Sequence, residues 1–104
     1  MDNVSYKLNM LPIFEQDLNN IVDYISIVLQ NPEAALRLID ETEVAIQRRL
    51  LNPTAFEPFH SRHERVHPYY RIAVGNYYIF YVVIDDIMEV RRMLYSRQNW
   101  RQKL

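Results

Sequence analysis

The residues of this sequence that can take part in chemistry gather in its second half. Arg71 and Arg97 carry guanidinium groups, which are planar, permanently charged and forked toward phosphate oxygens. Tyr95 can donate a proton or stack on a nucleobase, and Glu64 or His67 can accept a proton. Cleavage of RNA by its own 2′-hydroxyl needs such a base, cations for the charge that builds on the phosphate, and an acid for the leaving oxygen. The sequence therefore offers Arg71, Arg97 and Tyr95 as catalytic candidates, with Glu64 or His67 as the general base.

Each of these residues also has an ordinary structural interpretation. Arg71 is equally consistent with an exposed arginine on a sheet, and Arg97 with the start of a solvated tail. Tyr95 alternates with Met93 and can simply pack on one face of a strand. Both interpretations stay open at the level of the sequence.

Three further side chains are candidates for binding RNA or a partner protein: Tyr78, Arg91 and Arg92. Tyr78 belongs to a group of tyrosines that can stack on nucleobases. Arg91 and Arg92 are neighbours on one expected strand, so we expect them to point to opposite faces of the sheet. At least one of them is then expected to pair with Glu89 or with an acid of a helix.

The three histidines, His60, His63 and His67, do not predict a metal site. Their spacing does not fit two ligands on one helix turn, the segment is loop-like, and the chain has no cysteine to supply a thiolate. We therefore expect neither a metal nor another cofactor.

Length and composition predict one domain that spans residues 1–104. The absence of cysteine fits a reducing compartment, and the first residues lack the pattern of a signal peptide. The longest apolar run, Tyr77 to Ile84, is far shorter than the roughly 20 residues of a membrane helix. We therefore expect a cytoplasmic protein that makes no contact with a membrane.

The net charge of −1 hides an uneven distribution. Up to Ser61 there are nine acids against four bases, and from Arg62 onward there are eight bases against four acids. A basic second half can attract a polyanion or an acidic protein partner, because both respond to the same field.

The first half of the chain predicts a strand followed by two helices. Apolar residues alternate from Val4 to Met10, which is typical of a strand, and then recur at helical spacing from Pro12 to Gln30. Asn31 and Pro32 can start a second helix that runs to about residue 51. So short a link predicts an antiparallel helical hairpin.

The second half predicts a loop over residues 52–68 and then three strands: Tyr70–Val74, Tyr77–Ile84 and Ile87–Tyr95. Gly75-Asn76 and Asp85-Asp86 are the turns between them, and a short helix is expected in the tail from Arg97 to Leu104. The fold class is therefore α+β, with the helices on one face of a three-strand antiparallel meander. We expect the opposite face to be an open, shallow surface.

Two stretches resemble one family of bacterial toxins. Residues 70–83 read YRIAVGNYYIFYVV and residues 88–97 read MEVRRMLYSR. This succession of a basic strand, a Gly-Asn turn, an apolar strand with tyrosine and a last strand running into arginine resembles the RelE/ParE toxins of type II toxin–antitoxin systems. The order of elements expected above is also that of the family, so the resemblance covers the chain.

The resemblance implies two alternative mechanisms. RelE-like members are similar to ribonucleases that enter the ribosomal A site and cut mRNA, whereas ParE-like members are similar to non-enzymatic poisons of DNA gyrase. Arg71 and Arg97 match basic positions of the RelE-like nucleases, but Tyr78 and Ala73 stand where many of them have basic residues. The first hypothesis is therefore a ribosome-dependent mRNA endoribonuclease. The alternatives are a gyrase poison, which the sequence pI of about 6.3 favours, and a family member that has lost its activity.

The family resemblance also implies a cognate antitoxin that wraps the toxin. An open sheet face with aromatic and basic side chains would suit an acidic amphipathic peptide. We expect the antitoxin to occupy this face and to mask Arg71 or Arg97.

Overall fold

The computed structural model describes residues 5–59 and 66–104 and has the expected α+β architecture. Its strands form one four-stranded sheet in the order β1-β4-β3-β2. The elements are β1 (Lys7–Met10), α1 (Pro12–Asp23), a π-helical turn η1 (Tyr24–Val28), α2 (Pro32–Leu50), β2 (Tyr70–Val74), β3 (Tyr77–Ile84), β4 (Ile87–Tyr95) and a 3₁₀ helix η2 (Trp100–Lys103). The three C-terminal strands have the bounds that the sequence predicts. Within the described ranges, no helix is long and apolar enough to cross a membrane.

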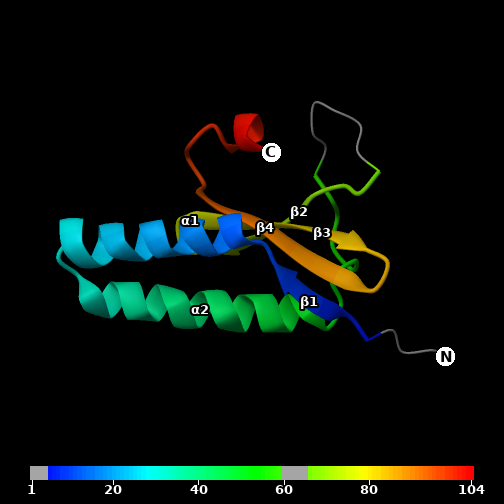
Figure 1. Ribbon diagram of the computed structural model, residues 1–104, viewed down its shortest axis with the longest axis horizontal. Coiled ribbons are helices and arrows are strands. Elements are labelled where there is room, and N and C mark those ends of the chain that lie inside the picture. The colour runs from blue at the N-terminus through cyan, green and yellow to red at the C-terminus, as the bar shows by residue number, and fades with distance from the viewer. Residues whose placement is uncertain (1–4, 60–65) are drawn as a thin grey trace.

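The helical hairpin forms where the capping residues predict it. The side chain of Asn31 accepts a hydrogen bond from the backbone N–H of Ala34 at 3.2 Å, which caps the start of α2. The first helix does not continue regularly to Gln30, because it ends in the π-helical turn η1. Val28 and Leu29 continue the helical spacing of apolar residues in this segment, but both are exposed. The reason is visible in Figure 1, where the junction of α1 and α2 projects past the end of the sheet.

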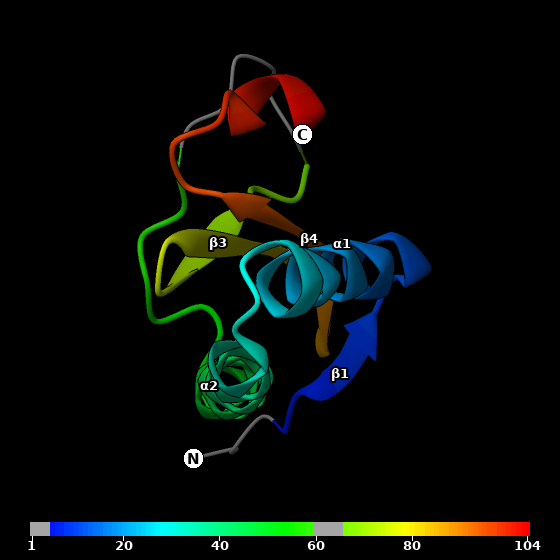
Figure 2. The ribbon, with the colours of Figure 1, turned by 90° about the vertical axis from the view of Figure 1, so that its left-hand side faces the viewer.

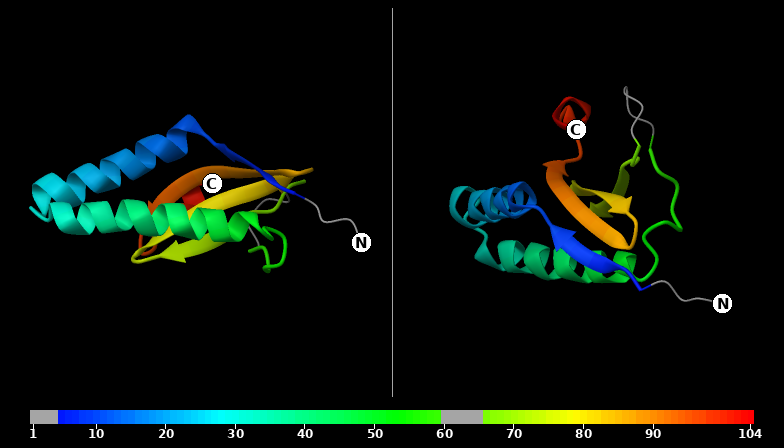
Figure 3. Two further views of the ribbon diagram at one scale, coloured as in Figure 1. Left: turned by 90° about the horizontal axis from the view of Figure 1, so that it is seen from below. Right: turned by 45° about the vertical axis from the view of Figure 1, so that its right-hand side comes forward.

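Two tight turns fix the antiparallel meander. Gly75 adopts φ +55° in the turn between β2 and β3, a region that costs little for glycine. Asp85 adopts the same φ in the turn between β3 and β4. The sequence predicts the first strand but not its position in the sheet. This strand, β1, pairs in parallel with β4, with Lys7 opposite Ile87, and forms an edge of the sheet that is seen at the right of Figure 3.

The main core lies between the helical hairpin and one face of the sheet (Figure 3, left). Phe14 of α1 is almost fully buried, as are Ile46 of α2 and Ile79 of β3. On α2 the buried residues are Ala35, Leu38, Thr42 and Ile46, all of which the helical spacing predicts.

A second, smaller core covers the opposite face of the sheet, where an open surface was expected. Phe80 and Val82 are fully buried there, and Trp100 of η2 is 6% exposed. The Trp100 ring lies 5.1 Å from the ring of Phe80 and 5.3 Å from that of Phe59. Figure 2 shows η2 on the side of the sheet away from α2. The expectation of an open face is therefore wrong, because the tail folds back and places its tryptophan on the strands.

Candidate functional site

Arg71 is held on the sheet by aromatic rings. Its Cζ lies 4.6 Å from the ring centre of Tyr78 and 5.7 Å from that of Trp100. On the tail, the Cζ of Arg101 lies 4.5 Å from the same Trp100 ring. Tyr78 and Trp100 meet edge to face at 6.1 Å. We call these four residues the cationic stack. In this stack two guanidinium groups lie against aromatic rings, an arrangement that suits contact with an anionic partner.

Arg91 and Arg92 are both engaged in ion pairs. A β-bulge sets Phe80 opposite Arg92 and Tyr81 opposite Val90, so Arg91 is the extra residue and the two arginines do not simply alternate. Arg91 Nε donates to Glu89 Oε2 at 2.8 Å. Arg91 thus pairs with Glu89, and Arg92 pairs with Asp17 of α1, whereas the sequence predicts an ion pair for at least one of them.

The second pair joins α1 to β4. Arg92 Nε and Nη2 donate to the two carboxylate oxygens of Asp17 at 2.8 and 3.0 Å, and the backbone N–H of Met93 donates to Asp17 Oδ2 at 3.0 Å. The hydrogen bonds to Asp17 raise the pKa of Arg92 above its ordinary value. Burial lowers the pKa of Arg91, but hydrogen bonds with Tyr69 and Glu89 outweigh burial and raise it overall.

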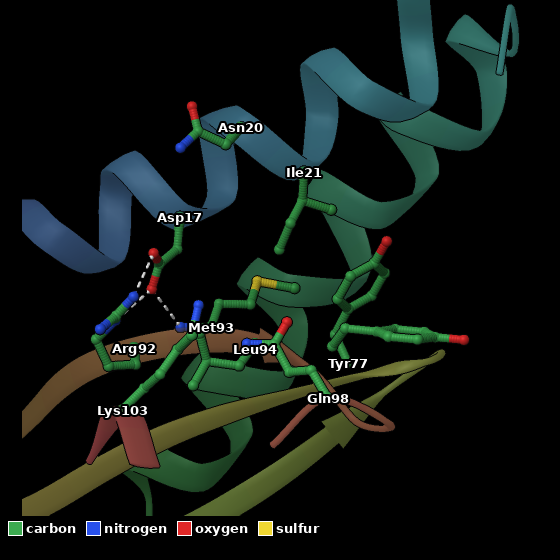
Figure 4. Close-up of a pocket in the computed structure, with 10 residues that line it drawn as sticks. Asp17, Asn20, Ile21, Tyr77, Arg92, Met93, Leu94, Gln98 and Lys103 are labelled. Carbon is green, nitrogen blue, oxygen red and sulfur yellow. Dashed lines mark hydrogen bonds and ion pairs between the residues drawn. The ribbon is translucent and has the colours of Figure 1, made fainter. Parts of the chain in front are cut away.

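Tyr95 lies on the helix side of the sheet, beside a cleft. Its ring meets that of Tyr77 edge to face at 5.8 Å, and it is 40% exposed. The cleft lies between α1, the end of β4 and the tail, and Figure 4 shows Asn20 and Ile21 on α1 above it with Gln98 and Lys103 below. Tyr95 and the cationic stack are therefore on different faces of the sheet.

The remaining candidates do not join one catalytic cluster. Arg97 is exposed in the turn after β4, where the Ser96 N–H donates to the Asn76 carbonyl at 2.8 Å. His67 is half-buried in the segment before β2. His60, His63 and Glu64 lie outside the described residues. Across the described ranges, no hydrogen bond, ion pair or ring contact joins Arg71 to Arg97, Tyr95 or His67.

The tail contributes residues to both surfaces, which the local sequence pattern does not predict. The cationic stack includes Trp100 and Arg101 of the tail, and the cleft beside Tyr95 is lined by Lys103. The available signal was the single tryptophan of the chain placed among basic residues, since a tryptophan is seldom left in solvent.

Comparison with known proteins gives one family and a set of similar structures. The sequence model of the ParE toxin of the type II toxin–antitoxin system parDE matches residues 8–100. A chain of the chromosomal ParDE TA system from P. aeruginosa has a similar fold, with a TM-score of 0.71 and 15% identity over 89% of this chain and 98% of that chain. A chain of the RelB–RelE antitoxin–toxin complex from Methanococcus jannaschii is 25% identical over 86% of this chain and 91% of that chain, with a TM-score of 0.49. No curated protein matches the sequence.

Proposed function

The chain belongs to the family of ParE toxins of type II toxin–antitoxin systems, and from that premise we propose that it inhibits growth as a non-enzymatic poison of DNA gyrase. Such a toxin acts by binding and needs no general base or acid. Its target would place it in the cytoplasm. The match of the ParE model over residues 8–100 supports this mechanism over the ribonuclease that the residue types alone favoured.

The separation of the candidate catalytic groups is the structural observation that carries the proposal. A nuclease needs cations free to meet the phosphate beside a proton donor and acceptor. Arg71 and Arg97 are exposed cations, but within the described residues neither has a hydrogen bond or a ring contact with Tyr95 or His67. Arg71 and Tyr95 lie on different faces of the sheet. This arrangement supports binding more than catalysis.

We also propose that a cognate antitoxin neutralises the toxin. The family model is that of a toxin of a toxin–antitoxin system, and one of the similar structures comes from a ParDE TA system. The basic second half of this chain fits an acidic partner.

A ribosome-dependent ribonuclease is the second candidate function. The cationic stack favours it, because arginines on aromatic rings can contact both phosphates and unstacked bases of RNA. In that case Arg71 would be a contact to mRNA, and Arg97 or Tyr95 would act at a site completed by the ribosome.

Purified toxin can be compared on gyrase with supercoiled plasmid and on translating ribosomes with mRNA. We expect trapped gyrase–DNA breaks and intact mRNA. The variants Arg97→Ala and Arg71→Ala test whether the exposed cations contribute to binding, and Arg37→Ala, an exposed arginine of α2, is the matched control. mRNA cleavage that requires ribosomes and is lost in Arg71→Ala, with gyrase unaffected, would overturn the proposal in favour of the nuclease.

A further inference from the structure

The cleft beside Tyr95 has the size of an anchor site for one side chain. Its volume is about 180 Å³, below the range of roughly 300–1,000 Å³ that is typical of sites for small-molecule ligands. Asn20 and Ile21 line it from α1, Tyr77, Met93 and Tyr95 from the strands, and Gln98 and Lys103 from the tail. A single large apolar side chain of a partner would fill such a space.

Two tyrosines, Tyr77 and Tyr95, line this cleft, and Tyr95 is 40% exposed. The rings of Tyr77 and Tyr95 meet edge to face at 5.8 Å, and burial, together with the phenols of Tyr95 and Tyr24, raises the pKa of Tyr77. Tyrosine is enriched at the centre of protein interfaces, because it supplies a large rigid surface with a polar end.

The free charge around the cleft is positive. Asp17 is the acid among its lining residues, and Arg92 and the Met93 N–H already satisfy it. Lys103 lines the cleft, and Arg97 immediately precedes Gln98, another lining residue. Neither Lys103 nor Arg97 forms an ion pair within the described part of the chain. A partner that enters here therefore meets unpaired ammonium and guanidinium groups.

We propose that this cleft is the docking site for an acidic amphipathic segment of the antitoxin. One apolar side chain of the segment enters between Ile21, Tyr77 and Tyr95, and its flanking carboxylates pair with Lys103 and Arg97. The inference rests on the proposed function, which supplies the antitoxin as the partner. It also replaces the sheet face expected from the sequence, because the second core covers that face.

Binding can be measured with two synthetic peptides that differ only in charge. Both place apolar residues at helical spacing; one has glutamate flanks and the other has lysine flanks, and each is fluorescein-labelled for anisotropy. The wild-type protein is compared with Tyr95→Ala and Lys103→Glu, which change exposed side chains. Arg37→Glu makes a charge reversal of the same size on α2, away from the cleft-lining residues, and so controls for net charge.

We expect the glutamate peptide to bind the wild-type protein at least ~10-fold more tightly than the lysine peptide does. Tyr95→Ala and Lys103→Glu should each weaken its binding by ~10-fold or more, whereas Arg37→Glu should change it by less than about 2-fold. Amide NMR signals of Asn20, Ile21 and Gln98 should shift on binding. Equal weakening by Lys103→Glu and Arg37→Glu, or no binding of the glutamate peptide to the wild-type protein, would overturn the proposal.

The peptide and gyrase experiments fail independently. Loss of the peptide result while the toxin still traps gyrase on DNA overturns only the docking site. The expected peptide result without any effect on gyrase supports the docking site and overturns only the gyrase target.

Discussion

The ion pair between Asp17 and Arg92 is expected to contribute strongly to the stability of this fold. Asp17 accepts three hydrogen bonds, two from Arg92 and one from the Met93 N–H, and the two side chains are 13% and 20% exposed. Removal of one partner from a buried ion pair costs about 3–5 kcal/mol, because it leaves an uncompensated charge. Arg92 keeps some access to water, so we expect Asp17→Ala to lower the free energy of unfolding by about 3 kcal/mol.

Urea denaturation followed by circular dichroism measures this cost. The matched control is Lys7, whose pair with Asp86 is longer, at 3.8 Å, with Lys7 78% exposed. Lys7→Met should cost at most about 0.5 kcal/mol. Asp17→Asn keeps the shape and one acceptor oxygen, so its cost should lie between the two. A cost of Asp17→Ala within ~0.5 kcal/mol of that of Lys7→Met would refute the reasoning.

Two further substitutions test the packing between α2 and the sheet. Tyr81→Phe removes a hydroxyl that donates to the Pro53 carbonyl at 2.8 Å and accepts from Arg49 Nη1 at 2.9 Å, so it should cost about 1–3 kcal/mol in the same urea experiment. Burial raises the pKa of the Tyr81 hydroxyl above its ordinary value of 10.0, so as the pH rises the unfolded chain loses this proton before the folded chain does. The free energy of unfolding of the wild-type protein should therefore fall as the pH rises above that value, and more steeply than that of Tyr81→Phe. An equal alkaline slope in both proteins would contradict this assignment. Thr42→Val should stabilise by up to about 1 kcal/mol, since the Thr42 hydroxyl is buried and has no hydrogen-bond partner in the described part of the chain; a loss of stability, measured by thermal unfolding, would show that the hydroxyl is bonded.

Local patterns in the sequence predict the helices and strands of this fold, but they do not predict every pairing between strands. The period of two, interrupted by Gly75 and by Asp85, defines the meander because turn and strand preferences act over a few residues. The parallel pairing of β1 with β4 joins segments about eighty residues apart, as in Leu8 opposite Met88. No local preference specifies such a pairing, which depends on how the hairpin packs across the sheet.

The second core was missed for a related reason. The sequence predicts a short helix in the tail, but the tail has too few apolar residues to show a period. Its packing against the sheet is therefore not predicted. Burial of Trp100 against Phe80 and Phe59 decides that position. A large aromatic ring removes enough surface from water to hold a four-residue 3₁₀ helix on the strands.

The roles of the basic residues depend on one local and one non-local contact. Arg91, Arg92 and Arg97 are equivalent as residue types, and the charge asymmetry counts them alike. The fold separates them, because Glu89 and the distant Asp17 neutralise the first two while Arg97 stays exposed beyond the end of the sheet. Because Arg92 neutralises the Asp17 carboxylate, Lys103 carries the unpaired charge among the cleft-lining residues of the described part of the chain. The ion pair that fastens α1 to β4 thus also sets the charge that a partner meets, which links the stability of the domain to the chemistry of its docking surface.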